Sequence, residues 1–215
     1  MTNVTPTVAA LYVDLRGPYP SIPGVQCWGL PERDALEYDG PHPVVAHPPC
    51  GPWGKLAFVS VKQDPTCGPR AVAQVRRWGG VLEHPQGSRL FRRCGMPHPV
   101  ELPDEWGGRT IEVEQVKWGH VARKRTWLYL VGVAKVPPDP PPREPTHWCS
   151  GFRTGGGRSY PAGYQRTGCA VPEGIKVCSA QQRRRTPPAF AELLVSLARQ
   201  AGAAQRNSEE NSDEH

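Results

Sequence analysis

Short apolar runs separated by turn residues are the main pattern of this chain, and they predict buried strands. The runs lie at residues 10–15, 25–28, 43–46, 81–83 and 126–133, and residues 110–116 alternate as a half-buried strand does. A helix is predicted over residues 70–78, which the pair Gly79-Gly80 ends. Apolar strands that alternate with a helix are typical of a mostly parallel α/β sheet, so residues 1–136 are expected to form an α/β core.

The last third of the chain has a different composition. Residues 137–145 hold six prolines and are expected to be an extended linker. Residues 146–185 are rich in glycine, arginine and cysteine and predict a small loop-rich appendage. A helix over residues 186–201 begins at Thr186, a good N-cap residue, and its apolar face should pack back on the core. Residues 202–215 are polar and acidic and are expected to be disordered.

Length and composition narrow the class of protein. The 215 residues suffice for one domain with a core and a small appendage. The chain lacks an apolar stretch long enough to span a membrane and a basic segment leading into an apolar one, so we expect no membrane partner and no signal peptide. We expect a monomer in the cytoplasm, where the seven cysteines stay mostly reduced.

The charge balance is basic, at a formal net charge of +6. Arginine and lysine gather at residues 76–77, 89–93, 123–125 and 183–185. Such clusters fit contact with DNA or RNA, and they fit equally well a solvated basic surface from an arginine-rich genome. The proline- and arginine-rich composition suggests a phage-encoded protein that acts in a bacterial host cell.

A cysteine and a glutamate follow two of the predicted strands. Cys50 closes the turn Pro48-Pro49-Cys50 after residues 43–46, and Glu83 ends the run at residues 81–83. Functional groups gather at the carboxyl ends of strands in open α/β sheets, so the two side chains can share a pocket. Thiolate attack on a pyrimidine, with an acid at the ring nitrogen, suits this pair. Taken alone, Cys50 is more often a small buried residue.

Several segments, in order, resemble motifs of the DNA cytosine-5 methyltransferases. Residues 33–35 resemble the acidic adenine-contacting motif, and residues 43–53 resemble the Pro-Cys nucleophile loop. Residues 81–85 resemble the Glu-Asn-Val motif, with His84 in place of Asn. Residues 121–129 resemble the Gln-x-Arg-x-Arg motif, with Val121 in place of Gln, and residues 186–191 are a weaker echo of the final helix.

This resemblance implies a reduced Rossmann-like methyltransferase sheet that acts on a cytosine flipped out of duplex DNA. It implies that Cys50 adds to C6 of the base and that Glu83 holds N3 and the exocyclic amine. It further implies that Arg123 or Arg125 orients the base or a phosphate. Trp53, His84 and Pro85 are the remaining residues expected beside the base, from their places in the same motifs.

The implied cofactor is S-adenosylmethionine, whose methyl group goes to C5. The resemblance places Asp34 at the adenine amine, Asp14 and Gly17 at the methionine end, and Pro48 in the cofactor-binding set. This side departs most from the family pattern. A proline-rich loop replaces the glycine-rich one, and about twenty residues between Asp14 and Asp34 leave little room for a second strand and its ribose-binding acid.

Two other functions stay open at this point. The chain can be a catalytically inactive DNA-binding protein on the same scaffold, or it can modify a free pyrimidine nucleotide with the same cysteine. Whether the abbreviated cofactor site takes S-adenosylmethionine or another donor also stays open. A structural zinc ion is a further expectation. His147, Cys149, Cys169 and Cys178 offer four ligands in a loop-rich segment that is too small to be stable without a cross-link.

Overall fold

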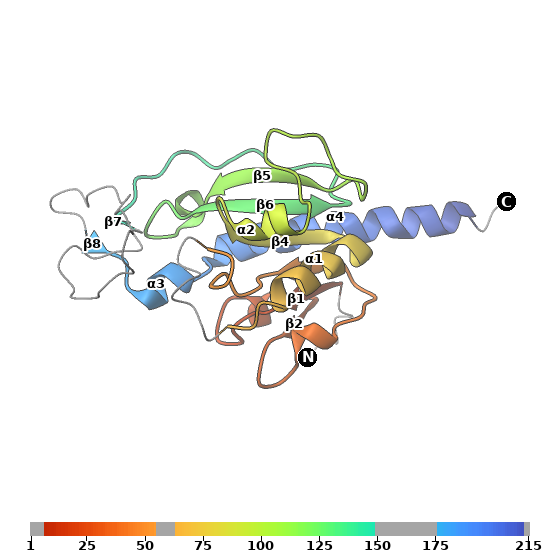
Figure 1. Ribbon diagram of the computed structural model, residues 1–215, viewed down its shortest axis with the longest axis horizontal. Helices are drawn as coiled ribbons and strands as arrows, with labels where there is room; N and C mark the ends of the chain where they lie inside the picture. Colours follow the sequence, from red (N-terminus) through yellow and green to blue (C-terminus); the bar gives the residue numbers. More distant parts are fainter. Residues whose placement is uncertain (1–6, 55–62, 149–175, 213–215) are drawn as a thin grey trace.

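The computed structural model describes residues 7–54, 63–148 and 176–212 and is built on one six-stranded sheet (Figure 1). Its strands follow the spatial order β2-β1-β3-β4-β6-β5. Their bounds are β1 Val8–Leu11, β2 Val25–Trp28, β3 Val44–Ala46, β4 Gly80–Pro85, β5 Arg109–Glu114 and β6 Arg125–Val131. The predicted α/β core is therefore confirmed, and every predicted strand occurs within a few residues of its expected position.

Strand direction divides the sheet in two. The strands β1 to β4 are parallel to one another, whereas β6 runs antiparallel to both β4 and β5. The sheet is thus mixed, with a parallel half and a hairpin half. The first strand ends earlier than predicted, at Leu11, because Tyr12 takes a left-handed backbone conformation with φ of 59°.

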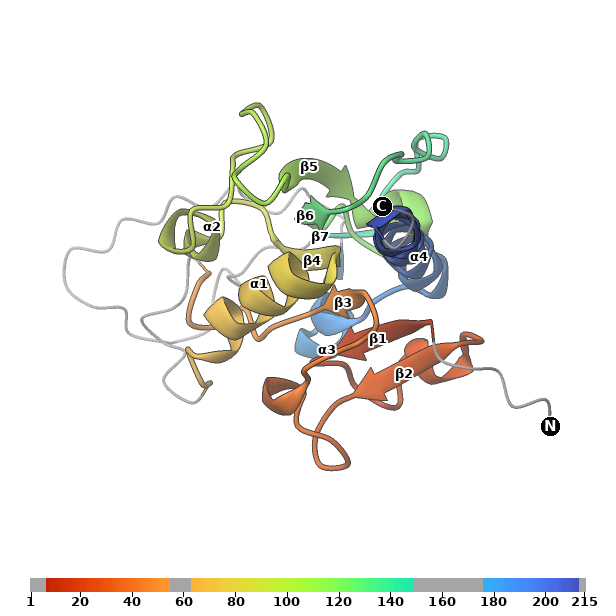
Figure 2. The same ribbon diagram turned by 90° about the vertical axis from the view of Figure 1, so that its right-hand side faces the viewer.

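Two helices cover the two faces of the sheet (Figure 2). The helix α1, Cys67–Trp78, buries Ala71, Val72 and Val75 against one face. The helix α4, Pro188–Ser212, buries Phe190 and Leu194 against the other. Alternate residues of each strand point to opposite faces, so both faces of the sheet are apolar and both need a helix.

The predicted end of the last helix is wrong. The segment 202–212, expected to be disordered, continues α4 as a helix to Ser212. Its polar composition had indicated a loose tail, but a helix already fixed by its buried first turns is propagated at low cost. Within the described residues, none of the helices has both the length and the apolar character needed to cross a bilayer.

Several short elements were not predicted. These are the helices α2 Arg89–Arg93 and α3 Ala180–Arg184, the two-stranded parallel sheet of β7 His147–Trp148 and β8 Lys176–Val177, and the 3₁₀ helices Tyr19–Ser21, Ala35–Glu37 and Gln115–Trp118. Elements of five residues or fewer carry too few positions to show periodicity. Most of the expected appendage, residues 149–175, lies outside the described residues.

The site is positioned by the carboxyl ends of β1, β3 and β4. The strand order reverses at β1, because β2 lies on one side of it and β3 on the other. Open α/β sheets bind ligands at such a reversal. The strands β3 and β4 also approach closely, since a Cβ at Gly80 would lie 2.0 Å from the carbonyl oxygen of Val44, and Gly80 has a φ of 115°.

Candidate active site

The turn after β3 presents Cys50 at the surface. Pro48 is buried and Pro49 is half-buried, and the two prolines restrict the backbone that leads to the cysteine. The carbonyl oxygen of Cys50 accepts hydrogen bonds from the backbone N–H groups of Trp53, at 3.1 Å, and Gly54, at 2.8 Å. Cys50 therefore sits at a fixed turn, exposed to an incoming ligand.

Glu83 lies across from this turn because of the strand register. Ala46 pairs with Leu82, so the next residue on each strand, His47 and Glu83, face each other. The His47 Nδ1–H donates to Glu83 Oε2 at 3.0 Å, and the two side chains are 12% and 11% exposed. In neutral His47 this leaves Nε2 to accept from the hydroxyl of buried Tyr19, 2.5 Å away. Glu83 is thus tied to both neighbouring parallel strands.

The hairpin half of the sheet holds the other oxygen of Glu83. Gln115 Nε2 donates to Glu83 Oε1 at 2.8 Å and to Thr126 Oγ1 at 2.9 Å. The Thr126 hydroxyl in turn donates to the carbonyl of Lys124 at 3.0 Å. Each carboxylate oxygen has two acceptor positions, so both retain room for one further donor. A base that offers an amine and a protonated ring nitrogen matches that remaining capacity.

Local charge keeps Glu83 ionised and Cys50 protonated. Burial alone would raise the pKa of Glu83, but Lys124, the hydrogen bond from His47 and the attraction of His47 and His84 when protonated together lower it to about 2. Partial burial of the thiol, and then the negative charge of Glu83, raise the pKa of Cys50, although Lys124 and Arg184 act in the opposite direction. The thiol therefore needs a further positive charge or a proton acceptor before it can attack.

His84 lies in the interior behind the turn. Its side chain is fully buried, and neither ring nitrogen has a hydrogen bond of normal geometry within the described residues. Burial lowers the pKa of His84 to about 4, against the opposing influence of Glu83 and of the nearby Pro49 carbonyl. His84 is therefore neutral at ordinary pH and supports the turn from beneath, while Pro85 ends β4 half-buried.

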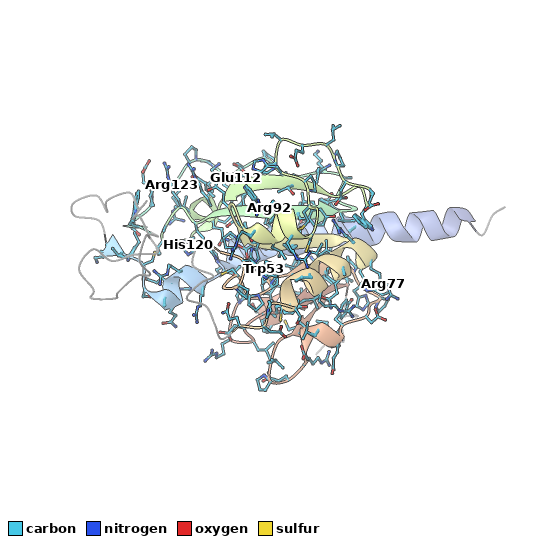
Figure 3. All side chains as sticks on the ribbon, viewed as in Figure 1. Trp53, Arg77, Arg92, Glu112, His120 and Arg123 are labelled. Atoms are coloured by element: carbon cyan, nitrogen blue, oxygen red, sulfur yellow. The ribbon has the colours of Figure 1, made fainter. Side chains whose placement is uncertain are left out.

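The predicted arginines, Arg123 and Arg125, lie at the same edge of the sheet as Glu83, but both are held by Glu114. Arg125 Nε lies 3.1 Å from Glu114 Oε1, and Arg123 Nε lies 3.9 Å from Glu114 Oε2. The residue between them, Lys124, is the cation that acts on both Cys50 and Glu83. Figure 3 shows Arg123 near His120 at the end of the molecule that carries the small sheet.

The predicted cofactor residues make mainly local contacts. Asp14 and Arg16 form an ion pair at 3.0 Å, with side chains 62% and 91% exposed, and that hydrogen bond lowers the pKa of Asp14. Gly17 closes a turn by donating its N–H to the Asp14 carbonyl at 2.8 Å. Asp34 Oδ1 caps the 3₁₀ helix Ala35–Glu37 by accepting from Leu36 N–H at 2.9 Å.

The loops at this side also include an aromatic residue. Trp28 ends β2, its ring meets Tyr38 edge-on, and the guanidinium of Arg33 lies 5.4 Å from its ring centre. The strand β2 itself shows that the interval from Asp14 to Asp34 does accommodate a second strand. A Cβ at Gly29 would lie 2.0 Å from the Val13 carbonyl oxygen, so the loops after β1 and β2 pack directly on each other.

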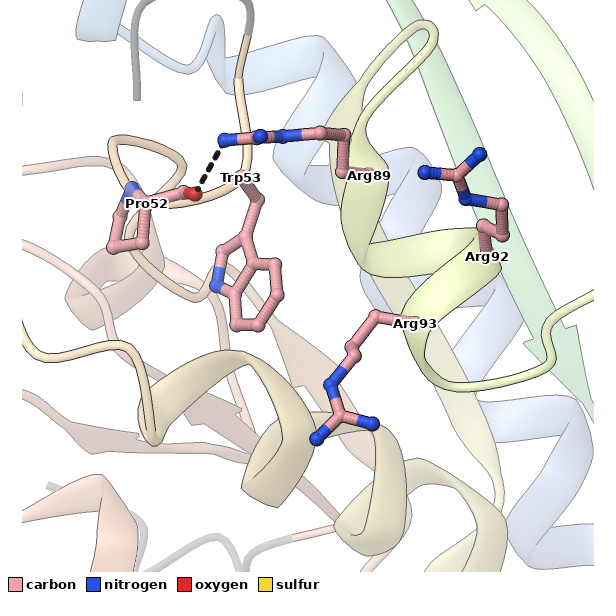
Figure 4. Close-up of a pocket in the computed structure, with 5 residues that line it drawn as sticks. All are labelled: Pro52, Trp53, Arg89, Arg92 and Arg93. Atoms are coloured by element: carbon pink, nitrogen blue, oxygen red, sulfur yellow. Dashed lines mark hydrogen bonds between the residues drawn. The ribbon is translucent and has the colours of Figure 1, made fainter. Parts of the chain in front are cut away.

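Trp53 forms a wall of a cavity beside the Cys50 turn (Figure 4). Its indole is half-buried and lies against Gly68, where a Cβ would approach Trp53 Nε1 to 2.6 Å. The other lining residues are Pro52, Arg89, Arg92 and Arg93. The contact with Gly68 thus holds Trp53 in place as a pocket wall.

The zinc prediction falls mostly outside the described residues. Cys149 and Cys169 lie there, while buried Cys178 and half-buried His147 are described. The described part of the chain contains no group of three or more His, Cys, Asp or Glu side chains that could hold a metal ion. The zinc site stays a prediction.

Four residues of the Glu83 network were missed as site residues: Tyr19, His47, Gln115 and Thr126. His47 had a usable signal, because it directly follows an apolar strand and precedes the Pro-Pro-Cys turn. Tyr19 and Gln115 had no such signal, because they reach Glu83 only through the folded sheet.

The chain was compared with protein-family models, with curated proteins and with solved structures, and it matches none of them. The resemblance to cytosine-5 methyltransferases therefore rests on the motifs alone.

Proposed function

We propose that this protein is a DNA cytosine-5 methyltransferase-like enzyme with a reduced Rossmann-like sheet. One observation carries the proposal: the Cys50 turn follows β3, Glu83 lies near the end of the adjacent parallel strand β4, and the His47 side chain, after β3, bonds to Glu83 at 3.0 Å. The pair therefore forms one site at the carboxyl edge of the sheet. A nucleophile beside an ionised, positioned carboxylate supports covalent addition to a pyrimidine ring.

The residues have distinct roles in this proposal. Cys50 gives its proton to solvent and its thiolate adds to C6 of the extrahelical cytosine as N3 takes up a proton from solvent, while Glu83 accepts from the exocyclic amine and from the protonated N3. Lys124 stabilises the charge on the thiolate and on Glu83. After C5 has gained its substituent and lost its proton to solvent, the Cys50 thiolate departs, N3 returns its proton to solvent and the ring regains its aromaticity.

The cofactor side fits S-adenosylmethionine at one end. Asp34 has a second carboxylate oxygen, Oδ2, with no hydrogen bond to the described residues, and Trp28 offers an aromatic surface nearby, so these two residues would hold the adenine. Asp14 is exposed and paired with Arg16, so it does not provide a preformed site for the methionine end. When bound, the cofactor supplies an electrophilic methyl group.

A second candidate function has an observation in its favour. The raised pKa of Cys50 and the exposed Asp14 are what a catalytically inactive DNA-binding protein on this scaffold would show. Such a protein predicts that Cys50→Ser leaves DNA binding and biological effect unchanged. An enzyme acting on a free pyrimidine nucleotide would instead be indifferent to DNA.

Covalent trapping tests the proposal. The protein is incubated with labelled S-adenosylmethionine and duplex DNA that contains 5-fluorocytosine, and the products are separated under denaturing conditions. A methylating enzyme gives a labelled covalent complex that Cys50→Ser abolishes, whereas Cys27→Ser, a half-buried cysteine away from the turn, retains it. Absence of trapping together with absence of cofactor binding by calorimetry would refute the methyltransferase proposal.

A further inference from the structure

An open cavity of about 500 Å³ lies beside the Cys50 turn and is strongly basic. Three of its five lining residues are arginines of α2, and none carries a negative charge; the set is Pro52, Trp53, Arg89, Arg92 and Arg93. In Figure 4, Arg89 and Arg93 flank the indole of Trp53, and Arg92 lies farther out. The cavity therefore combines a rigid aromatic wall with several guanidinium groups.

The cavity is built on the same segments as the candidate active site. The backbone N–H of Arg89 donates to the Trp53 carbonyl at 3.0 Å, and Arg89 Nη2 donates to the Pro52 carbonyl at 3.3 Å. The helix α2 also follows β4, the strand of Glu83, after a short turn capped by Ser88. A ligand in the cavity would therefore lie against the turn that presents Cys50.

Two arginines of α2, Arg92 and Arg93, lack the acid partners that several other described arginines have. Arg76, Arg77 and Arg125 each pair with an acid, whereas the exposed side chains of Arg92 and Arg93 make no hydrogen bond or ion pair with the described residues. Buried Leu90 and Phe91 fix α2 to the core and hold these arginines outward. Unpaired cations held in a fixed array are available to an external anion.

The spacing of the arginines indicates an anion with several separated charges. Arg89, Arg92 and Arg93 occupy positions i, i+3 and i+4, so they share one side of the helix. Guanidinium groups bind phosphate oxygens through paired N–H donors. Further positive charge comes from Lys124 and Arg184, which belong to other elements and act on the Cys50 thiol. Cations from several segments thus lie around the Cys50 turn, an arrangement that suits a polynucleotide strand better than a single nucleotide.

We propose that Arg89, Arg92 and Arg93 bind backbone phosphates of duplex DNA beside the nucleotide that enters the Cys50 site. The identity of the polynucleotide rests on the proposed function, whereas the phosphate contacts do not depend on any chemistry at Cys50. Arg89 also donates a hydrogen bond to the Pro52 carbonyl and so helps to hold the Cys50 turn in place. The clearest test therefore uses Arg92 and Arg93.

Binding of a fluorescein-labelled duplex, followed by anisotropy over a range of KCl concentrations, tests this site. The double variant Arg92→Gln/Arg93→Gln should bind about tenfold more weakly or worse, and the slope of log affinity against log salt should shrink by about 2. The matched control is Arg77→Gln/Arg109→Gln, which removes the same charge at the opposite edge of the sheet, where α1 ends and β5 begins. Figure 3 shows Arg77 away from Arg92 and Trp53, toward the C-terminus.

The outcomes separate this inference from the proposed function. An unchanged affinity and salt slope in the α2 variant, or an equal loss in the control, overturns the phosphate site. Competition by inorganic pyrophosphate or a cytidine nucleotide as effective as that by duplex overturns its assignment to a polynucleotide, and preference for single-stranded RNA overturns its assignment to DNA. DNA binding that needs Arg92 and Arg93 without any trapping at Cys50 supports this inference while it refutes the methyltransferase.

Discussion

Two sides of the sheet edge are built differently: the thiol side, which holds Cys50 and Glu83, and the cofactor side, which holds Asp14 and Asp34. On the thiol side, hydrogen bonds reach Glu83 from His47 and Gln115, which are 36 and 32 positions away in the sequence. On the cofactor side, Asp14 and Asp34 bond to residues only two positions away. The Glu83 network joins several elements and therefore exists only in the folded sheet. The turns at Asp14 and Asp34 need only their own neighbouring residues. The difference identifies the Glu83 side as the preorganised part of the site.

The largest expected effect comes from Glu83→Gln, which tests whether this preorganisation serves chemistry. Gln keeps the shape and an oxygen that can accept from His47, but it loses the charge that holds protonated N3. The rate of methyl incorporation into duplex DNA should fall about 100- to 10,000-fold. The matched control is Glu112→Gln on β5, whose carboxylate accepts from Trp127 and Gln86. Equal rates for wild type and Glu83→Gln would remove Glu83 from the mechanism.

The second-largest effect is expected from low pH, which should destabilise the thiol side. The folded-state pKa of Glu83, about 2, lies below its ordinary value of 4.5, so its stabilising contribution is complete above about pH 4.5 and is lost as the pH falls toward 2. The pKa of His84 is lowered from 6.5 to about 4, so the unfolded chain takes up that proton first and stability falls between those two values as well.

Across its own pH window, the titration of each of these groups lowers the free energy of unfolding by on the order of 3 kcal/mol. Urea unfolding measured from about pH 7 to about pH 3 should show a continuous loss of stability. Glu83→Gln should remove the part of the loss below pH 4.5 and keep the part above it. A variant with the same pH profile as the wild type would show that Glu83 is not held as an ionised, buried carboxylate.

A smaller effect is expected from Asp34→Asn on the cofactor side. Asn caps a helix as well as Asp does, so the 3₁₀ helix Ala35–Glu37 should persist. Loss of the charged acceptor for the adenine amine should weaken S-adenosylmethionine binding about tenfold by calorimetry. Unchanged binding would mean that the adenine lies elsewhere and that the two sides differ even more than proposed.

The smallest effect is expected from Asp14→Asn. The ion pair with Arg16 is exposed and local, and such pairs contribute little to stability. The melting temperature should not change measurably by calorimetry, in contrast to the effect of Glu83→Gln. A clear drop would show that the loop after β1 is a structural part of the site, and the comparison would then need revision.

The sequence alone determined the strands, the two covering helices, the place of Cys50 after one strand and that of Glu83 toward the end of the next, because apolar periodicity and turn residues are local signals. It did not show that Gln115 and Tyr19 complete the Glu83 network, that Glu114 holds Arg123 and Arg125, or that α2 displays unpaired arginines. Those features depend on strand register and on contacts between residues distant in sequence. Such contacts form only when the parallel and hairpin halves join into one sheet, so the tertiary structure alone decided them.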